Sequence, residues 1–174
     1  NGQLGLAIKA ACANFPKLQF IFASKAELDV TKEEEIAAFF ENNQLDYCIN
    51  AAAYTNVDKA EEVPQAAYLL NETAPRLLAE VCKKYNVFLI HISTDYVFDG
   101  SGQRPWLETD ATAPLNVYGH SKLAGEKGIA EQGAKHVIFR TSWVYGTEGG
   151  NFAKTMLRLA QERERMTVIN DQFG

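Results

Sequence analysis

The sequence lacks the features that mark several large classes of protein. No apolar run approaches the length needed to cross a bilayer, and no segment has the pattern of a signal peptide. Basic residues are not concentrated, because 17 lysines and arginines stand among 22 acids and the net charge is −5. Binding to nucleic-acid phosphates needs a concentrated basic face. We therefore expect neither a membrane nor a nucleic acid as a partner.

Cysteine is also scarce. The three cysteines, Cys12, Cys48 and Cys82, are odd in number, far apart and in apolar settings. The sequence has no CxxC pair and no cysteine–histidine cluster, so it predicts no metal site. Free thiols in a reducing compartment explain this pattern, and we expect a cytoplasmic protein.

Short runs of β-branched and aromatic residues alternate with segments of helical periodicity. Strands separated by helices of this length cannot pair as hairpins and are typical of βαβ units. The sequence predicts an α/β fold, a doubly wound Rossmann-type parallel sheet with helices on both faces. Thr31 and Glu34 have the spacing of a capping box at the start of a helix. The predicted strands are 18–23, 46–50, 87–93, 136–141 and 166–169, and the predicted helices are 4–14, 32–43, 64–86, 117–131 and 151–163.

The start of the chain predicts one side of a dinucleotide site. Gly2 and Gly5 open a helix, and a helix N-terminus after glycines offers amide donors to a pyrophosphate. Many helices also begin after a glycine. The chain starts at Asn1 without a methionine, and we expect that a preceding strand and one further glycine are missing.

The residues that follow the predicted strand 18–23 bear on the choice of cofactor. An acid there selects NAD, whereas Ser24 and Lys25 tolerate or slightly favour the 2′-phosphate of NADPH. A solvent-exposed lysine explains Lys25 equally well. Asp29 is placed either to bond adenine or to form a turn. The alanines of 51–53 leave room for a flat ligand or pack closely.

Tyr118 and Lys122 share one helix face, four residues apart. A cation near a phenol stabilises the phenolate and lowers the pKa of the tyrosine, which makes it a better proton donor at neutral pH. The spacing alone is weak evidence, but Ser93 and Thr94 follow the central predicted strand with hydroxyls suited to a carbonyl. Together these residues predict a short-chain dehydrogenase/reductase. None of the three histidines is required: His91 is expected in the core and His120 in solvent.

Several longer motifs carry a resemblance. They are CINAAAYTNVDK (48–59), HISTDYVFDG (91–100), VYGHSKLAGE (117–126), RTSWVYG (140–146), NFAKTMLRLA (151–160) and DQFG (171–174). In this combination and order the chain resembles the dTDP-4-dehydrorhamnose reductase family of extended short-chain dehydrogenases. The resemblance implies one NAD(P)-binding domain over 1–174, shortened at both ends, with the small C-terminal substrate-binding portion missing. We predict that a polypeptide with these ends folds poorly and turns over slowly.

The resemblance also implies an activity and a site. Hydride from NADPH or NADH would reduce the C4 ketone of dTDP-4-dehydro-L-rhamnose, in the last step of dTDP-rhamnose biosynthesis. The expected partner is this nucleotide sugar, bound by a monomer or homodimer. The implied residues are catalytic Thr94, Tyr118 and Lys122, cofactor-binding Gly2, Gln3, Leu4, Asp29, Val30, Ala52, Ala53, Tyr54, Ile92, Tyr118 and Lys122, and substrate-binding Thr94, Asp95 and Trp143.

The sequence also leaves alternative functions open. Related dehydratases carry an acid after Thr-Asp, whereas Tyr96 stands there in this chain, which disfavours elimination. A nucleotide-sugar epimerase, or another reductase, is a further alternative. The regulatory β subunit of methionine adenosyltransferase resembles the same family, so a non-catalytic NADP-binding role is the alternative of a different class. Trp143 follows a predicted strand, where a large aromatic residue either touches substrate or packs.

Overall fold

The computed structural model describes residues 2–102 and 104–168. The chain divides into two compact units, one of residues 23–141 and one of residues 1–22 with 142–174. The larger unit contains a three-stranded sheet of order β1–β2–β3, formed by Tyr47–Asn50, Phe88–Thr94 and His136–Thr141. Both strand pairs are parallel, with Asn50 opposite His91 and Thr94 opposite Thr141. The predicted parallel α/β arrangement is thus present in this unit.

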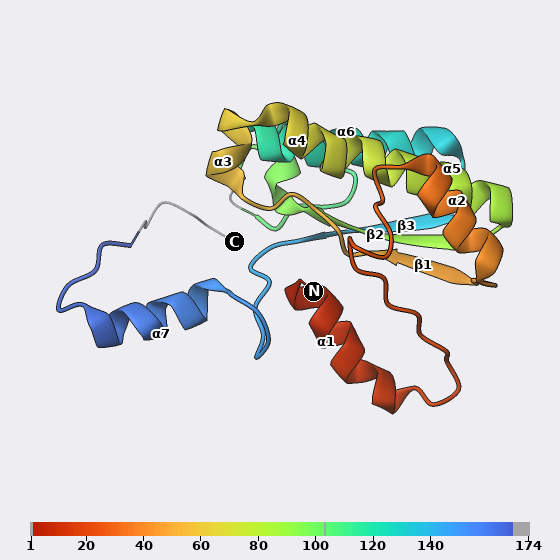
Figure 1. Ribbon diagram of the computed structural model, residues 1–174. Coiled ribbons are helices and arrows are strands. Elements are labelled where there is room, and N and C mark those ends of the chain that lie inside the picture. The colour runs from red at the N-terminus through yellow and green to blue at the C-terminus, as the bar shows by residue number, and fades with distance from the viewer. Residues whose placement is uncertain (1, 103, 169–174) are drawn as a thin grey trace. The chain divides into compact units, whose positions relative to one another are not determined.

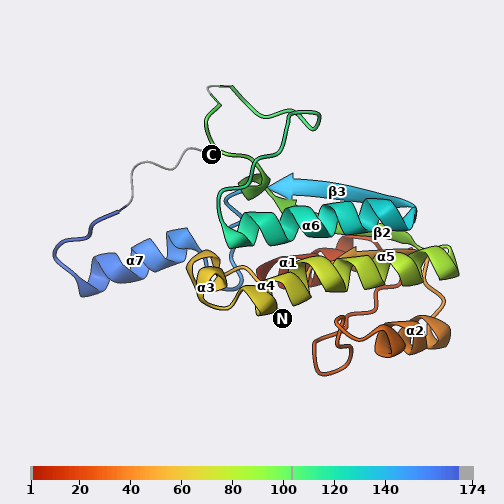
Figure 2. The same cartoon turned by 90° about the horizontal axis from the view of Figure 1, so that it is seen from above.

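The helices of the larger unit lie on one face of its sheet (Figure 1). They are α2 (Glu33–Asn42), α3 (Val57–Glu62), α4 (Pro64–Tyr68), α5 (Ala74–Tyr85) and α6 (Val117–Gln132). Helices α5 and α6 run next to each other over β2, as Figure 2 shows. The core between these helices and the sheet is apolar and is formed by Ile36, Phe40, Leu77, Leu78, Ala79, Val81, Cys82, Val87, Leu89, Ile129 and Ala134.

Capping side chains explain where the long helix α6 begins and ends. The side chain of Asn116 accepts a hydrogen bond from Gly119 N at 2.8 Å, which satisfies one of the free amides of the first turn. At the other end Gly133 adopts φ 67°, the left-handed conformation that glycine provides without strain. These two caps place Tyr118 and Lys122 in the first two turns of the helix.

The predicted helix 64–86 is continuous but not uniform. Residues Leu69–Thr73 form a π-helical turn, here η2, between α4 and α5. Short π-turns inside helices often occur at functional sites because they redirect a side chain. Here the turn carries Asn71, which is fully buried.

Two predicted strands and one predicted cap were wrong. Segment 18–23 forms no strand, because no strand pairs with it among the described residues and an isolated strand leaves its backbone groups unsatisfied. Residues 166–168 also lie outside any strand, and residue 169 falls outside the described residues. Helix α2 begins after Lys32 without a side-chain cap, since Thr31 donates its hydroxyl to Asp29 instead.

The smaller unit contains α1 (Gln3–Ala11), a 3₁₀ turn η1 (Cys12–Asn14) and α7 (Phe152–Glu162). Gln3 connects the two ends of this unit: its Nε2 donates to Val144 O at 2.8 Å, and its Oε1 accepts from Asn151 Nδ2 at 3.0 Å. Asn151 also caps α7 by accepting from Lys154 N. All three cysteines of the chain are free thiols, and Cys82 is buried.

Candidate active site

The end of β2 presents a buried hydroxyl beside a carboxylate. Thr94 is 4% exposed, and its Oγ1 donates to Asp95 Oδ1 at 3.1 Å and accepts from Tyr96 N at 3.2 Å. The short 3₁₀ turn η3 (Asp95–Val97) follows directly, with Thr94 as its cap. The threonine predicted to hold a carbonyl oxygen is therefore fixed in orientation at the carboxyl end of the central strand.

Helix α6 approaches this turn closely. A β-carbon on Gly119 would lie 2.2 Å from Tyr96 O, so only glycine permits this approach. The ring of Tyr118 meets that of Tyr96 edge-on, with centroids 5.5 Å apart. Thr94 is also among the groups that act on the pKa of Tyr118, which it lowers. The structure thus brings together Thr94 and Tyr118, which the sequence predicted as partners.

Burial controls the protonation of both proposed catalytic groups on α6. It raises the pKa of Tyr118, while Thr94 acts in the opposite direction and the charge of Asp95 adds to the increase. Burial also lowers the pKa of Lys122 to about 8, against the opposing charge of Glu126. The sequence predicted that Lys122 would lower the pKa of Tyr118, whereas in the structure burial of the phenol raises it.

The ammonium of Lys122 is directed at the backbone of β2. Its Nζ donates to Ile92 O at 2.6 Å and lies 3.4 Å from His91 Nε2. The side chain is 1% exposed, a rare condition for lysine. Ile92, predicted as a cofactor contact, thus holds the lysine through its carbonyl oxygen. His91 is fully buried, as expected of a core residue.

Asn71 is a site residue that the sequence reasoning missed. Its Oδ1 accepts from Tyr54 N at 2.8 Å, and its Nδ2 donates to Tyr54 O and to Ser121 Oγ, both at 3.0 Å. Ser121 in turn donates to Tyr118 O at 2.8 Å. One amide therefore ties the loop after β1 to the helix that carries Tyr118. The sequence did contain a signal for it: Asn71 follows two leucines within the predicted helix 64–86, where a polar residue next to apolar ones can indicate a buried hydrogen-bonding role.

The loop after β1 lies at the same sheet edge as Thr94, because parallel strands end together. Ala52 is exposed and donates its N–H to Asn50 Oδ1 at 3.0 Å, while Tyr54 is held by Asn71. Ala53 is half-buried. Small side chains line this loop next to the strand end, as a flat ligand requires.

Ser93 adds an unusual feature to this edge. It is 3% exposed, and within the described residues its Oγ has no hydrogen-bond partner. A buried hydroxyl without a partner is costly, so such groups in native proteins commonly bind water or a ligand.

The segment before α2 serves mainly as a turn. Asp29 Oδ1 accepts from Thr31 N and Thr31 Oγ1, at 3.1 and 2.7 Å. Val30 packs against the apolar core. Ser24 donates its N–H and its hydroxyl to Glu27 Oε2, each at 2.7 Å. The carboxylate of Glu27 thus occupies Ser24, one of the two residues that the sequence predicted to tolerate the 2′-phosphate of NADPH. A negative charge there repels a phosphate, which weakens that argument for NADPH.

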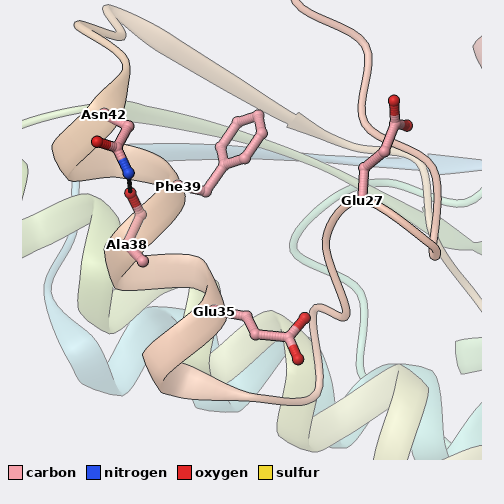
Figure 3. A pocket seen from close by; sticks show the side chains of 5 residues that line it. All are labelled: Glu27, Glu35, Ala38, Phe39 and Asn42. Atoms are coloured by element: carbon pink, nitrogen blue, oxygen red, sulfur yellow. Dashed lines mark hydrogen bonds between the residues drawn. The ribbon is translucent and has the colours of Figure 1, made fainter.

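A hollow of about 340 Å³ lies between this segment and α2 (Figure 3). Two carboxylates face it, Glu27 from the loop and Glu35 from the helix, and Phe39 supplies its apolar part. None of the predicted site residues lines it. Carboxylates repel a nucleotide phosphate, so this hollow is not a candidate for the cofactor.

The smaller unit carries the remaining predicted residues. Gly2 caps α1 in an extended conformation, the first turn has no side-chain cap, and Leu4 is half-buried. Trp143 is 49% exposed, packs edge-on against Phe152 and has φ 51°. A bulky residue in this left-handed region is strained, a feature that recurs at functional sites.

Within the part of the chain that the structure describes, no group of three or more metal-ligating side chains gathers. The same described residues contain no helix with the length and apolar character of a membrane span.

Comparisons with known proteins match the whole chain. A family model described as the RmlD substrate binding domain matches residues 1–174. The dTDP-4-dehydrorhamnose reductases of Shigella flexneri and Escherichia coli K12 are 52% and 51% identical over 175 residues, 99% of this chain and 58% of each protein. A crystal structure of dTDP-4-dehydrorhamnose reductase from Bacillus anthracis in complex with NADP matches with a TM-score of 0.94 at 39% identity, over 99% of this chain and 61% of that one. This match confirms the predicted fold class, and the chain spans under two thirds of these relatives.

Proposed function

Because the chain belongs to the family described as the RmlD substrate binding domain, we propose that the protein containing it is an NAD(P)H-dependent reductase. Its substrate would be dTDP-4-dehydro-L-rhamnose, reduced at the C4 ketone to dTDP-L-rhamnose. The observation that carries the proposal is the buried group of Thr94, Tyr118 and Lys122 at the carboxyl end of β2. Relatives named for this activity are about half identical to the chain.

The residues present fit a dinucleotide cofactor. The uncapped first turn of α1 offers amides and the positive end of the helix dipole to a pyrophosphate. A β-carbon on Gly2 would meet nothing within 4 Å, so backbone approach there is open. Near the sheet edge, Ala52, Ala53 and Tyr54 would line the nicotinamide half. Ser93 offers an unused hydroxyl at that edge.

The cofactor would be NADPH or NADH, with a slight preference for NADPH. The preference rests on the relative whose crystal structure contains NADP. The Ser24–Lys25 pair adds little, because Ser24 is engaged by Glu27. Asp29 and Val30 would lie at the adenine.

Each residue of the site would have its own role in the reduction. A bound dihydronicotinamide supplies a hydride to the ketone carbon. Thr94 Oγ1 would donate a hydrogen bond to the ketone oxygen, and Tyr118 would deliver its phenolic proton to that oxygen as negative charge develops. The ammonium of Lys122 would stabilise the resulting phenolate. Asp95 and Trp143 would contact the sugar nucleotide.

A coupled assay tests this proposal. dTDP-4-dehydro-L-rhamnose is generated in situ, and oxidation of NADPH and of NADH is followed separately at one wavelength. We expect formation of dTDP-L-rhamnose, and a loss of about 10²- to 10⁴-fold in kcat for Tyr118→Phe, because the phenyl ring retains the packing and lacks the proton.

Cofactor binding is measured in parallel by fluorescence titration. Tight binding of NADPH without product from any dTDP-4-keto sugar would contradict the proposal and favour a non-catalytic binding role. An unchanged kcat in Tyr118→Phe would remove Tyr118 as the proton donor.

A further inference from the structure

A line of buried polar side chains leads from Asn50 through His91 to Lys122. Asn50, His91 and Lys122 are 4%, 0% and 1% exposed. Asn50 Nδ2 lies 3.1 Å from His91 Nδ1, and His91 Nε2 lies 3.4 Å from Lys122 Nζ. The line begins at the loop after β1, where Ala52 N donates to Asn50 Oδ1 at 3.0 Å.

The backbone amide of Ala52 determines how Asn50 presents its side chain. An N–H group requires an acceptor, so the oxygen of Asn50 faces Ala52 and the NH₂ group faces His91. Because that NH₂ group donates, His91 Nδ1 must accept and carries no proton. A neutral imidazole then has its proton on Nε2. The doubly protonated ring is disfavoured as well, since burial, followed by the charge of Lys122, lowers the pKa of His91 to about 3.

This tautomer directs an N–H group at Lys122. An ammonium has no lone pair and cannot accept from Nε2–H, whereas a neutral amine can. With Lys122 charged, the long 3.4 Å contact joins two donors. With Lys122 neutral, Nζ accepts from His91 and still donates to Ile92 O at 2.6 Å. The imidazole thus discriminates between the two protonation states of the lysine.

The other charged and titratable groups around Lys122 act differently. Glu126, one turn further along α6, favours the ammonium, but Arg140 on β3 binds both of its carboxylate oxygens at 2.6–3.2 Å. Asp95 on η3 acts on Tyr118, whose phenol precedes Lys122 by one turn. His91 differs from both, because its ring nitrogen lies within contact distance of Lys122 Nζ, at 3.4 Å.

We propose that His91, which Asn50 holds in its Nε2–H tautomer, acts through Lys122: it favours the neutral amine and so sets the upper pH limit of the reaction, which needs the ammonium. The inference rests on the proposed role of Lys122. It assigns a function to a histidine and an asparagine outside the predicted site. Through Asn50 and His91 it also links the loop after β1, which would line the cofactor, to the protonation state of Lys122.

The tautomer is measured directly in the protein that contains this chain. Nitrogen-15 NMR of labelled histidine distinguishes protonated from unprotonated ring nitrogens without any turnover. We expect the signal assigned through His91→Phe to show protonated Nε2 and bare Nδ1. The reverse pattern would overturn the proposal, even if the reductase activity were present.

The substitution Asn50→Asp tests the consequence for Lys122. A carboxylate facing Nδ1 accepts a proton there, which turns Nε2 into an acceptor for the ammonium. We expect the titration of the Lys122 ¹³Cε resonance, and the alkaline limb of the kcat profile, to move up by about one pH unit.

A double variant separates this effect from the added charge. Asn50→Asp acts on Lys122 directly through its charge and indirectly through the imidazole, and only the indirect part needs His91. In a His91→Phe background the shift caused by Asn50→Asp should fall to less than half. An equal shift in both backgrounds would show that the histidine transmits nothing and would overturn the proposal. Because the NMR readouts need no substrate, failure of the coupled assay alone would count only against the proposed activity.

Discussion

Single buried polar side chains position the residues around Tyr118. Asn71 satisfies the N–H and C=O of Tyr54 and the hydroxyl of Ser121 with one amide group. Ser121 is fully buried, and the two bonds to the backbone of Tyr54 are partly buried. Removal of the amide would leave several polar groups unpaired, and such groups cost more than the net value of the bonds themselves.

We predict that Asn71→Ala destabilises the fold by about 3 kcal/mol, because buried partners lose their hydrogen bonds. Chemical denaturation measures the loss. Asn42→Ala is the matched control, since its amide donates to the exposed carbonyl oxygen of Ala38, and we expect a change below about 0.5 kcal/mol there. Equal effects at the two positions would contradict this account of Asn71.

The sequence was informative about residues whose contact follows from local geometry. Tyr118 and Lys122 lie one turn apart on any α-helix, so their common face could be predicted. The contacts of Asn71 and His91 could not, because each reaches a residue far away along the chain. For the same reason the sequence predicted a lowered pKa for Tyr118, whereas burial, which depends on the packed structure, raises it.

At the scale of elements, close approach of α6 to its neighbours depends on glycine. A β-carbon on Gly125 would lie 2.0 Å from Asn71 O, in the π-helical turn η2. A backbone atom cannot move aside as a flexible side chain can. Gly128, one turn later, would meet only the side chain of Arg76, at 3.2 Å.

We therefore expect Gly125→Ala to destabilise the protein by about 3 kcal/mol through overpacking. Gly128→Ala should change stability by less than about 1 kcal/mol, because the gain in helix propensity offsets the movement of Arg76. Thermal unfolding of the two variants side by side gives the comparison. If both were tolerated equally, the contact between α6 and η2 would be looser than described.

An ion pair between α6 and β3 also holds α6 against its neighbours. Arg140 and Glu126 bond through three N···O contacts of 2.6–3.2 Å, with side chains 25% and 8% exposed. Breaking a buried pair on one side leaves an uncompensated charge.

Arg140→Ala should cost about 3 kcal/mol for this reason. The exposed pair of Arg76 and Glu80, at 3.6 Å, provides the control, and Arg76→Ala should cost less than about 1 kcal/mol. Urea unfolding at low and high salt separates the two cases, since salt screens the exposed pair more strongly. A cost at Arg140 no larger than at Arg76 would show that Glu126 is effectively solvated.

At the scale of the whole molecule, buried His91 makes stability depend on pH. Its pKa is lowered from 6.5 to about 3, so the unfolded chain binds a proton at this residue where the folded protein does not. Stability from this source is complete above pH 6.5 and is lost as the pH falls towards 3. Carboxylates titrate mainly below pH 4.5, so above that pH the contribution of His91 is separable from theirs.

Between pH 6.5 and pH 4.5 we predict a fall of about 2 kcal/mol in the free energy of unfolding. Urea titrations at several pH values would measure it. In His91→Phe the same window should be nearly flat. A fall of equal size in that variant would mean that another group is responsible.

The fold class and the order of most elements followed from the sequence itself. Periodicity is a local property, and it predicted strands at 46–50, 87–93 and 136–141 that the structure contains within one residue at each end. It failed at 18–23, where strand formation requires a paired neighbour and not only β-branched and aromatic residues. Tertiary structure alone decided the rest: the π-turn that buries Asn71, the exclusion of water from Lys122, and the tautomer of His91. These depend on groups brought together from distant parts of the chain, and burial sets the strength of their interactions.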